Sequence, residues 1–219
     1  TFGEVFGWVK TIYPLGKKTA LIIFALALVA FAVYYFTCSI LSLIVAIVYS
    51  IIALFTAFFF RDPYRPTVFK EDEIACPADG KILSIKTEDD ENVLVIRIFL
   101  SIFNVHIQRA TMNGEVKDVI YTKGSFAFAN NPQANKNERN LIKFADGDRF
   151  AYMEQITGAI ARRIECWVKP GQKVKAGDYA GIIYFGSQVA VYLPKDKVRI
   201  TVKEGQNVQG AITVLGLWR

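Results

Sequence analysis

The feature that most constrains the fold is an uncharged run of 42 residues, Thr19 to Phe60, in a chain of 219. A helix of that length extends roughly 63 Å, about twice the thickness of the hydrocarbon core of a bilayer. Two membrane-spanning helices fit this length. The aromatic and small polar residues of Tyr34–Ser39 mark the expected turn, because such residues suit the membrane interface. The sequence therefore predicts an α-helical transmembrane hairpin over residues 19–60.

The length and polarity of the run also bear on three alternatives to a spanning hairpin. A cleaved signal peptide has a much shorter apolar core. Buried helices of a soluble protein show polar residues on a periodic face, and this run has no charged residue on any face. A re-entrant hairpin that enters one leaflet is compatible with the same length.

Basic residues flank the run on both sides: Lys10, Lys17 and Lys18 precede it, and Arg61, Arg65 and Lys70 follow it. Cytoplasmic flanks of membrane helices are rich in Lys and Arg, and two spans return the chain to its starting side. We therefore expect a protein of the cell membrane with residues 1–18 as an N-terminal cytoplasmic segment. Residues 61–219 form a domain on the same, cytoplasmic side.

The three cysteines, Cys38, Cys76 and Cys166, are isolated from one another. They have neither the spacing of a disulfide framework nor a CxxC pair, which favours a reducing compartment. The sequence shows no zinc-site spacing, so no metal is expected.

The net charge of +6 requires a partner or a solvated surface. Beside a membrane anchor it favours attraction to anionic lipid headgroups. Nucleic acid is not an expected partner, because the sequence contains no recognised binding motif or basic helix.

From Ala75 onward the pattern changes to short β-type runs separated by glycine, such as Lys81–Lys86 and Val93–Ile107. Val168–Gly177 and Val202–Gly210 share the pattern Val-Lys-x-Gly-Gln-x-Val, which predicts a strand, a turn and a strand twice over. Such turns are common in small biotinyl- or lipoyl-like domains. The fold class is therefore mainly β, a compact barrel- or sandwich-like domain after the helical hairpin.

Four short segments carry candidate chemistry, and each also has a structural explanation. Ser187 follows Gly186 within the apolar run Gly181–Pro194, where the pair could form a bulge. His106 is the only histidine, and a lone histidine in a strand is more often structural than catalytic. Asp79 precedes a glycine, as in many ordinary turns. The charged segment Asn137–Arg139 suits a solvated surface.

Together and in order, a set of segments resembles the short, membrane-hairpin branch of the phosphatidylserine decarboxylase family, which includes archaetidylserine decarboxylase-like proteins. The segments are FFRDPYR (Phe59–Arg65), PADGKI (Pro77–Ile82), FLSIFNVHIQRA (Phe99–Ala110), NGEV (Asn113–Val116), KGSFAFAN (Lys123–Asn130), NERN (Asn137–Asn140), GAIARRI (Gly158–Ile164) and GIIYFGSQVAVYLP (Gly181–Pro194).

The resemblance implies that the chain cuts itself between Gly186 and Ser187. The products are a β subunit of residues 1–186 and an α subunit of residues 187–219, which form a heterodimer. Ser187 becomes a covalent pyruvoyl group, which binds the amine of the substrate as a Schiff base and acts as an electron sink. The implied reaction is decarboxylation of an anionic serine phospholipid, phosphatidylserine or archaetidylserine, to the ethanolamine lipid.

The resemblance also implies roles for individual residues. Ser187 is the nucleophile of self-cleavage, Gly186 provides the scissile carbonyl, and Asp79 belongs to the cleavage machinery. His106 is the acid or base of decarboxylation. The longer branch carries a second histidine three residues later, where this chain has Arg109. The residues expected to bind substrate are Arg109, Asn137, Glu138, Arg139 and Phe185.

Two further functions stay open on the residues alone. A membrane-anchored, biotinyl-like adaptor would remain an uncut chain, although neither Met112 nor Met153 has the neighbouring lysine of a carrier. A serine hydrolase fits the residue types, but the segment around Ser187 lacks the G-x-S-x-G elbow. A homo-oligomer is compatible with the sequence.

Overall fold

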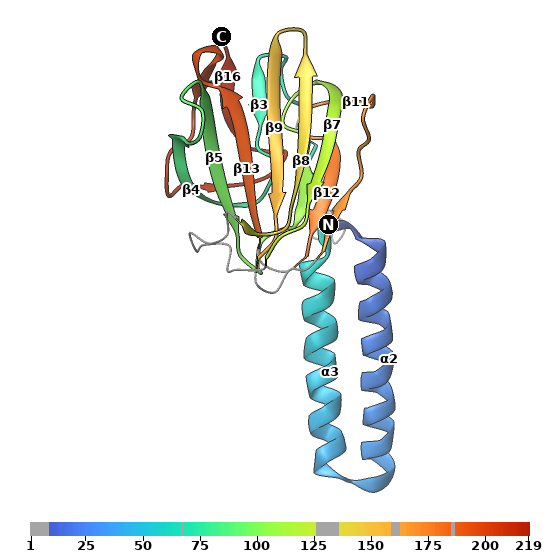
Figure 1. The fold of residues 1–219 in the computed structure, drawn as a ribbon. Coiled ribbons are helices and arrows are strands. Elements are labelled where there is room, and N and C mark those ends of the chain that lie inside the picture. The colour runs from blue at the N-terminus through green and yellow to red at the C-terminus, as the bar shows by residue number, and fades with distance from the viewer. Residues whose placement is uncertain (1–8, 67, 126–135, 159–162, 185–186) are drawn as a thin grey trace. The chain divides into compact units, whose positions relative to one another are not determined.

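The structure is a computed structural model that describes residues 9–66, 68–125, 136–158, 163–184 and 187–219 (Figure 1). The chain divides into two compact units, Thr1–Tyr64 and Arg65–Arg219. The first contains the predicted helices and the second is built of β-strands, which confirms the fold class.

The first unit is a helical hairpin of α2 (Pro14–Thr37) and α3 (Ile40–Phe59), both long and apolar enough to cross a membrane. The turn falls within the predicted segment, where Cys38 adopts a left-handed backbone that ends α2. Helix α2 begins at Pro14, five residues before the uncharged run, because proline suits the first position of a helix. Short strands β1 (Val9–Ile12) and β2 (Arg61–Pro63) pair antiparallel at its base.

The described residues of the second unit form one eight-stranded and two three-stranded antiparallel sheets. The large sheet has the order β11-β7-β8-β9-β13-β5-β4-β15, and the small ones β10-β12-β6 and β14-β16-β3. The strands are β3 (Glu73–Ala75), β4 (Gly80–Thr87), β5 (Val93–Leu100), β6 (Ile107–Arg109), β7 (Gly114–Thr122), β8 (Arg139–Asp146), β9 (Arg149–Ile156), β10 (Ile164–Cys166), β11 (Lys173–Val174), β12 (Tyr179–Ile183), β13 (Ser187–Pro194), β14 (Val198–Ile200), β15 (Asn207–Val208) and β16 (Val214–Trp218); a 3-10 turn, η2 (Lys195–Lys197), follows β13.

The pairings show that this unit is made of two equivalent halves. The first half consists of strands β3–β5 and β13–β16, and the second half consists of strands β6–β12. Each strand of one half has neighbours that correspond to those of its counterpart in the other half. The halves meet at the central pair, β9 and β13. The second half is inserted into the first between β5 and β13. In the second half, the corresponding strands β8 and β9 are joined by a direct turn.

The repeated sequence pattern marks the same local structure in each half. Lys169 donates its backbone N–H to the Gln172 side chain, and Lys203 donates to Gln206 in the same way. The glycine inside each turn has a left-handed backbone, with φ of +84° and +79°. Each pattern then forms an edge strand of the large sheet, β11 or β15. The predicted double turn is thus confirmed, although these strands are only two residues long.

Candidate functional site

Ser187 is the first residue of β13, in the middle of the large sheet. Alternation along the strand puts its side chain on the same face as the core residues Val189 and Val191. Ser187 has no exposed surface, and its Oγ has no hydrogen-bond partner among the residues that the structure describes. A buried hydroxyl without a partner costs about 1–3 kcal/mol, so its position requires an explanation. Gly186 and Phe185 lie outside the described residues.

The outer face of the sheet holds the residue after Ser187 in place. Gln188 accepts a hydrogen bond of 2.9 Å from Nη1 of Arg97, on the neighbouring strand β5. Arg97 is itself oriented by Glu88 at 2.6 Å. The same bond lowers the pKa of the Glu88 carboxyl from its usual value. The Arg97 side chain, which binds both Glu88 and Gln188, therefore anchors the start of β13.

Asp79 lies at the same end of the sheet as Ser187, immediately before β4. Lys81 pairs with Phe99 and Ser187 with Leu100, so the two residues flank the end of β5. Strands are about 4.8 Å apart, which places the two backbones roughly 10 Å apart. The Asp79 carboxylate accepts three hydrogen bonds, two from Arg65 at 2.6 and 2.7 Å and one from the Gly210 N–H at 2.8 Å.

Arg65 was not predicted as a partner of Asp79. The sequence suggested only a positive flank of the membrane run, because a contact with Asp79 depends on the tertiary fold. The two side chains are 6% and 10% exposed, and a bidentate pair of this kind fixes the orientation of a carboxylate. Arg65 is the first residue of the β unit, so the chain enters this unit at the end that carries Ser187.

His106 lies just before β6, at the end of the loop that leaves β5. It is 1% exposed, and its Nδ1 lies 2.9 Å from the Asn104 carbonyl oxygen. Because a carbonyl only accepts, Nδ1 carries the proton in this contact, and Nε2 of the neutral ring has the basic lone pair. The His106 carbonyl accepts the N–H of Ile183, four residues before Ser187. His106 thus lies beside the segment that leads to the Gly186–Ser187 bond.

Three buried amide side chains link the His106 strand to the large sheet. Gln108 donates to the His106 carbonyl at 2.6 Å, Gln155 donates to Gln108 at 3.0 Å, and Asn140 donates to Gln155 at 2.9 Å. All three amides are at most 2% exposed. Sequence analysis missed this chain, because its members come from three separate strands and share no local pattern. A satisfied buried network of this type favours one arrangement of the packed sheets.

The predicted substrate-binding segment Asn137–Arg139 lies on the other side of Ser187 from Asp79. Residues Arg139, Ile156 and Gln188 stand side by side on β8, β9 and β13. Asn137 is 1% exposed and donates 2.7 Å to the Thr157 carbonyl. A hydrogen bond with Glu138 raises the pKa of Tyr121. The segment therefore forms the rim of the Ser187 end of the sheet.

Arg139 and Arg109 differ in their surroundings. Arg139 lies 3.4 Å from Glu154. The Arg109 guanidinium lies 3.8 Å from the centre of the Tyr179 ring, three residues beyond His106 on β6. The structure thus brings Asp79, His106 and Asn137–Arg139 to the Ser187 end and places the Arg109 guanidinium over the Tyr179 ring.

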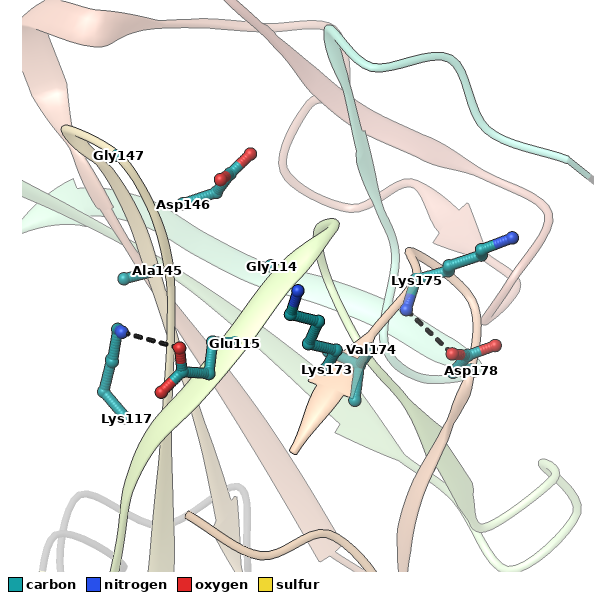
Figure 2. A pocket seen from close by; sticks show the side chains of 10 residues that line it. All are labelled: Gly114, Glu115, Lys117, Ala145, Asp146, Gly147, Lys173, Val174, Lys175 and Asp178. Atoms are coloured by element: carbon teal, nitrogen blue, oxygen red, sulfur yellow. Dashed lines mark hydrogen bonds and ion pairs between the residues drawn. The ribbon is translucent and has the colours of Figure 1, made fainter. Parts of the chain in front are cut away.

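A cavity of about 750 Å³ lies at the opposite end of the large sheet, beside the β8–β9 turn (Figure 2). Lys117 pairs with Glu115 at 3.0 Å in its lining, and the backbone N–H of Lys175 donates to the Asp178 carboxylate at 2.7 Å. Ala145 and Gly147, at the end of β8, line the cavity. The start of β8 lies instead at the Ser187 end of the sheet. Volume alone therefore does not mark the candidate site.

Fold and site define a β-domain protein with two helices long and apolar enough to cross a membrane. Its buried serine lies where one half of the β unit is inserted into the other. Comparison with known proteins agrees with this class. The model of the family "Phosphatidylserine decarboxylase" matches residues 52–216, and the chain belongs to this family of decarboxylases. The resemblance inferred from the ordered segments is thus confirmed.

Curated relatives extend the similarity along the chain. A phosphatidylserine decarboxylase proenzyme of Carboxydothermus hydrogenoformans is 44% identical over 169 residues, covering 74% of this chain and 79% of the relative. One from Desulfotalea psychrophila is 37% identical over 181 residues, with 79% and 84% covered. One from Ehrlichia chaffeensis is 36% identical over 219 residues, with 96% and 93% covered, so that the similarity includes the helical hairpin.

Proposed function

We propose that this chain is a proenzyme that cuts itself between Gly186 and Ser187 and then decarboxylates a serine phospholipid. The observation that carries the proposal is the buried Ser187 hydroxyl, which has no hydrogen-bond partner among the described residues. A structural serine at this depth would be satisfied by the backbone. A nucleophile must instead be held close to its target, with its oxygen available for attack.

Self-cleavage needs no group from outside the chain except water. The Ser187 oxygen attacks the Gly186 carbonyl carbon, the C–N bond breaks, and an ester and a free amine result. Loss of the Cα proton and of the Cβ–O bond releases the carboxylate of Gly186 and leaves a dehydroalanine. Water then converts this residue to a pyruvoyl group with release of ammonia.

Asp79 and His106 are proposed to move the protons of these steps. Asp79 is a carboxylate at the end of the sheet that carries Ser187, oriented by Arg65 and the Gly210 N–H. His106 has the tautomer of a base at Nε2 and lies beside the segment leading to the scissile bond. As the only histidine, it is also the proposed acid or base of decarboxylation.

A pyruvoyl group fits this site because the serine from which it forms is buried and directly follows the Gly186 carbonyl. When present, it supplies an electrophilic ketone that withdraws electrons from the substrate as carbon dioxide leaves. The segment Asn137–Arg139 and Phe185 are proposed to bind the headgroup. Arg109, whose guanidinium is stacked on Tyr179, is also proposed to bind substrate.

The proposed substrate follows from the relatives, whose names specify phosphatidylserine. Archaetidylserine carries the same serine headgroup and is accepted by the same chemistry. The mature protein is an α/β heterodimer of residues 187–219 and 1–186, with its β domain on the cytoplasmic side of the cell membrane.

The test is an intact-mass spectrum of the purified protein beside a Ser187→Ala variant. The proposal expects two species, one ending at Gly186 and one starting at residue 187 with the mass of a pyruvoyl terminus. The variant stays whole and does not release carbon dioxide from phosphatidylserine. A wild-type chain that stays uncut in lipid would contradict the proposal and favour a non-enzymatic adaptor.

A further inference from the structure

The loop between β5 and His106 exposes two apolar side chains at the Ser187 end of the β unit. Phe103 is 65% exposed and Ile102 36% exposed. Leu100, the last residue of β5, is the direct pairing partner of Ser187. The apolar pair therefore lies only a few residues from the proposed chemistry on one side and from His106 on the other.

The exposure of these side chains is built into a closed turn. Ser101 donates to the Asn104 side chain from both its N–H, at 2.9 Å, and its hydroxyl, at 2.8 Å. The Asn104 N–H returns a bond of 2.9 Å to the Ser101 carbonyl. The His106 ring then binds the Asn104 carbonyl. A turn held at both ends presents Ile102 and Phe103 outward instead of folding them onto the core.

Charge differs between the two ends of β5 in the described part of the chain. Lys123 and Lys136 are exposed at the Ser187 end, next to the ends of β7 and β8. The carboxylate of Glu165 at this end is paired with Arg163 at 2.9 Å. Roughly 25 Å away along β5, the β4–β5 turn carries the acidic run of residues 88–91. The Ser187 end thus combines the exposed apolar pair with exposed basic side chains.

We infer that the Ile102–Phe103 turn inserts into the surface of an anionic bilayer while Lys123 and Lys136 contact its headgroups; this rests on the proposed lipid substrate. A phospholipid keeps its tails in the bilayer, so its headgroup reaches a buried serine only if this end of the unit meets the membrane surface. Apolar side chains at the headgroup boundary and basic side chains on anionic lipids both strengthen such contact.

The first experiment does not depend on catalysis. Full-length Ser187→Ala protein carrying Phe103→Trp is placed in vesicles of brominated phosphatidylcholine and phosphatidylserine, and its fluorescence is compared with that of the Ser187→Ala parent. Added emission that is quenched by bromine supports insertion. Glu91→Trp, in the turn at the other end of β5, is the matched control and stays unquenched. Equal quenching at both positions, or none at position 103, would overturn the inference.

The second experiment uses the maturing enzyme with Ile102→Ser and Phe103→Ser combined. We expect normal self-cleavage and unchanged turnover of short-chain, water-soluble phosphatidylserine. The KM for vesicle phosphatidylserine should rise roughly tenfold to a hundredfold, as expected when two side chains lose apolar burial. Equal loss on both substrates, or loss of cleavage, would overturn the inference. An uncut wild-type chain would refute the proposed function, whereas the quenching result would still stand.

Discussion

The two halves of the β unit share a backbone and differ in chemistry. Asp79 in the first half corresponds to Asn113 in the second, and each side chain accepts one backbone N–H, from Gly210 at 2.8 Å or from Ala176 at 2.9 Å. Only Asp79 is also bound by an arginine, Arg65. The amide at position 113 shows that this turn needs an acceptor but not a charge. The carboxylate at position 79 adds a charge that pairs with Arg65, which agrees with its proposed role in self-cleavage.

The ends of the sheet differ in the same sense. In the second half β8 runs into β9 through a short turn, and the adjoining cavity contains the ion pair of Lys117 and Glu115 (Figure 2). In the first half the matching turn is opened by the inserted second half, and Ser187 begins the strand after the insertion. The candidate site thus lies where the repeat is interrupted, and the proposed scissile bond directly precedes the paired strand β13.

Asp79→Asn tests the comparison most strongly, because it gives the first half the side chain of the second. The amide can keep the bond from the Gly210 N–H but cannot act as a base. We expect self-cleavage to slow by about 10²–10⁴-fold, the usual contribution of a general base, measured as the cut fraction over time. Asn113→Asp should cut at the normal rate. Normal cutting by Asp79→Asn would remove the carboxylate from the mechanism.

Position 106 offers a similar exchange. Its counterpart in the first half is Asp72, which is exposed. The Asp72 carbonyl accepts a hydrogen bond from the Trp218 N–H, just as the His106 carbonyl accepts one from the Ile183 N–H. His106→Ala should lower the decarboxylation rate of whatever protein matures by about 10²–10⁴-fold, followed as carbon dioxide release per pyruvoyl group. Asp72→Ala is the control with unchanged release. Full activity without His106 would show that histidine takes no part in the reaction.

The buried amide chain is polar only in the second half. Asn140, Gln155 and Gln108 correspond to Leu94, Leu193 and Ile74. Gln155→Leu leaves the amides on either side without a partner and should destabilise the β unit by about 2 kcal/mol, measured by denaturant unfolding. Replacing all three by the first-half residues removes every unpaired group, so its cost should be smaller than that of Gln155→Leu alone. A larger cost for the triple variant would show that the amides stabilise by packing.

Local patterns predicted the parts of the molecule that are local. The uncharged run determined the hairpin and its turn, and the repeated Val-Lys-x-Gly-Gln-x-Val pattern predicted both edge turns, because each depends on neighbouring residues. The Arg65–Asp79 pair and the chain from Asn140 to His106 depend on distant segments meeting, which no spacing reveals. The insertion of one half into the other was also missed, since only strand order shows it. The site residues came from resemblance, and their roles stay predictions.

Cys76 gives an effect that is absent at neutral pH. Its counterpart is Ala110, and burial raises the pKa of its thiol from 9.0 to about 12. Above pH 9 the unfolded chain loses this proton while the folded chain keeps it, so the unfolded state binds fewer protons and stability falls as pH rises. The slope from this group approaches about 1.4 kcal/mol per pH unit between pH 9 and 12. Cys76→Ala, which copies the second half, should unfold with a shallower pH dependence in this range, measured against wild type by denaturant titration. Identical slopes would show that the buried thiol ionises as readily in the folded protein as in the unfolded chain.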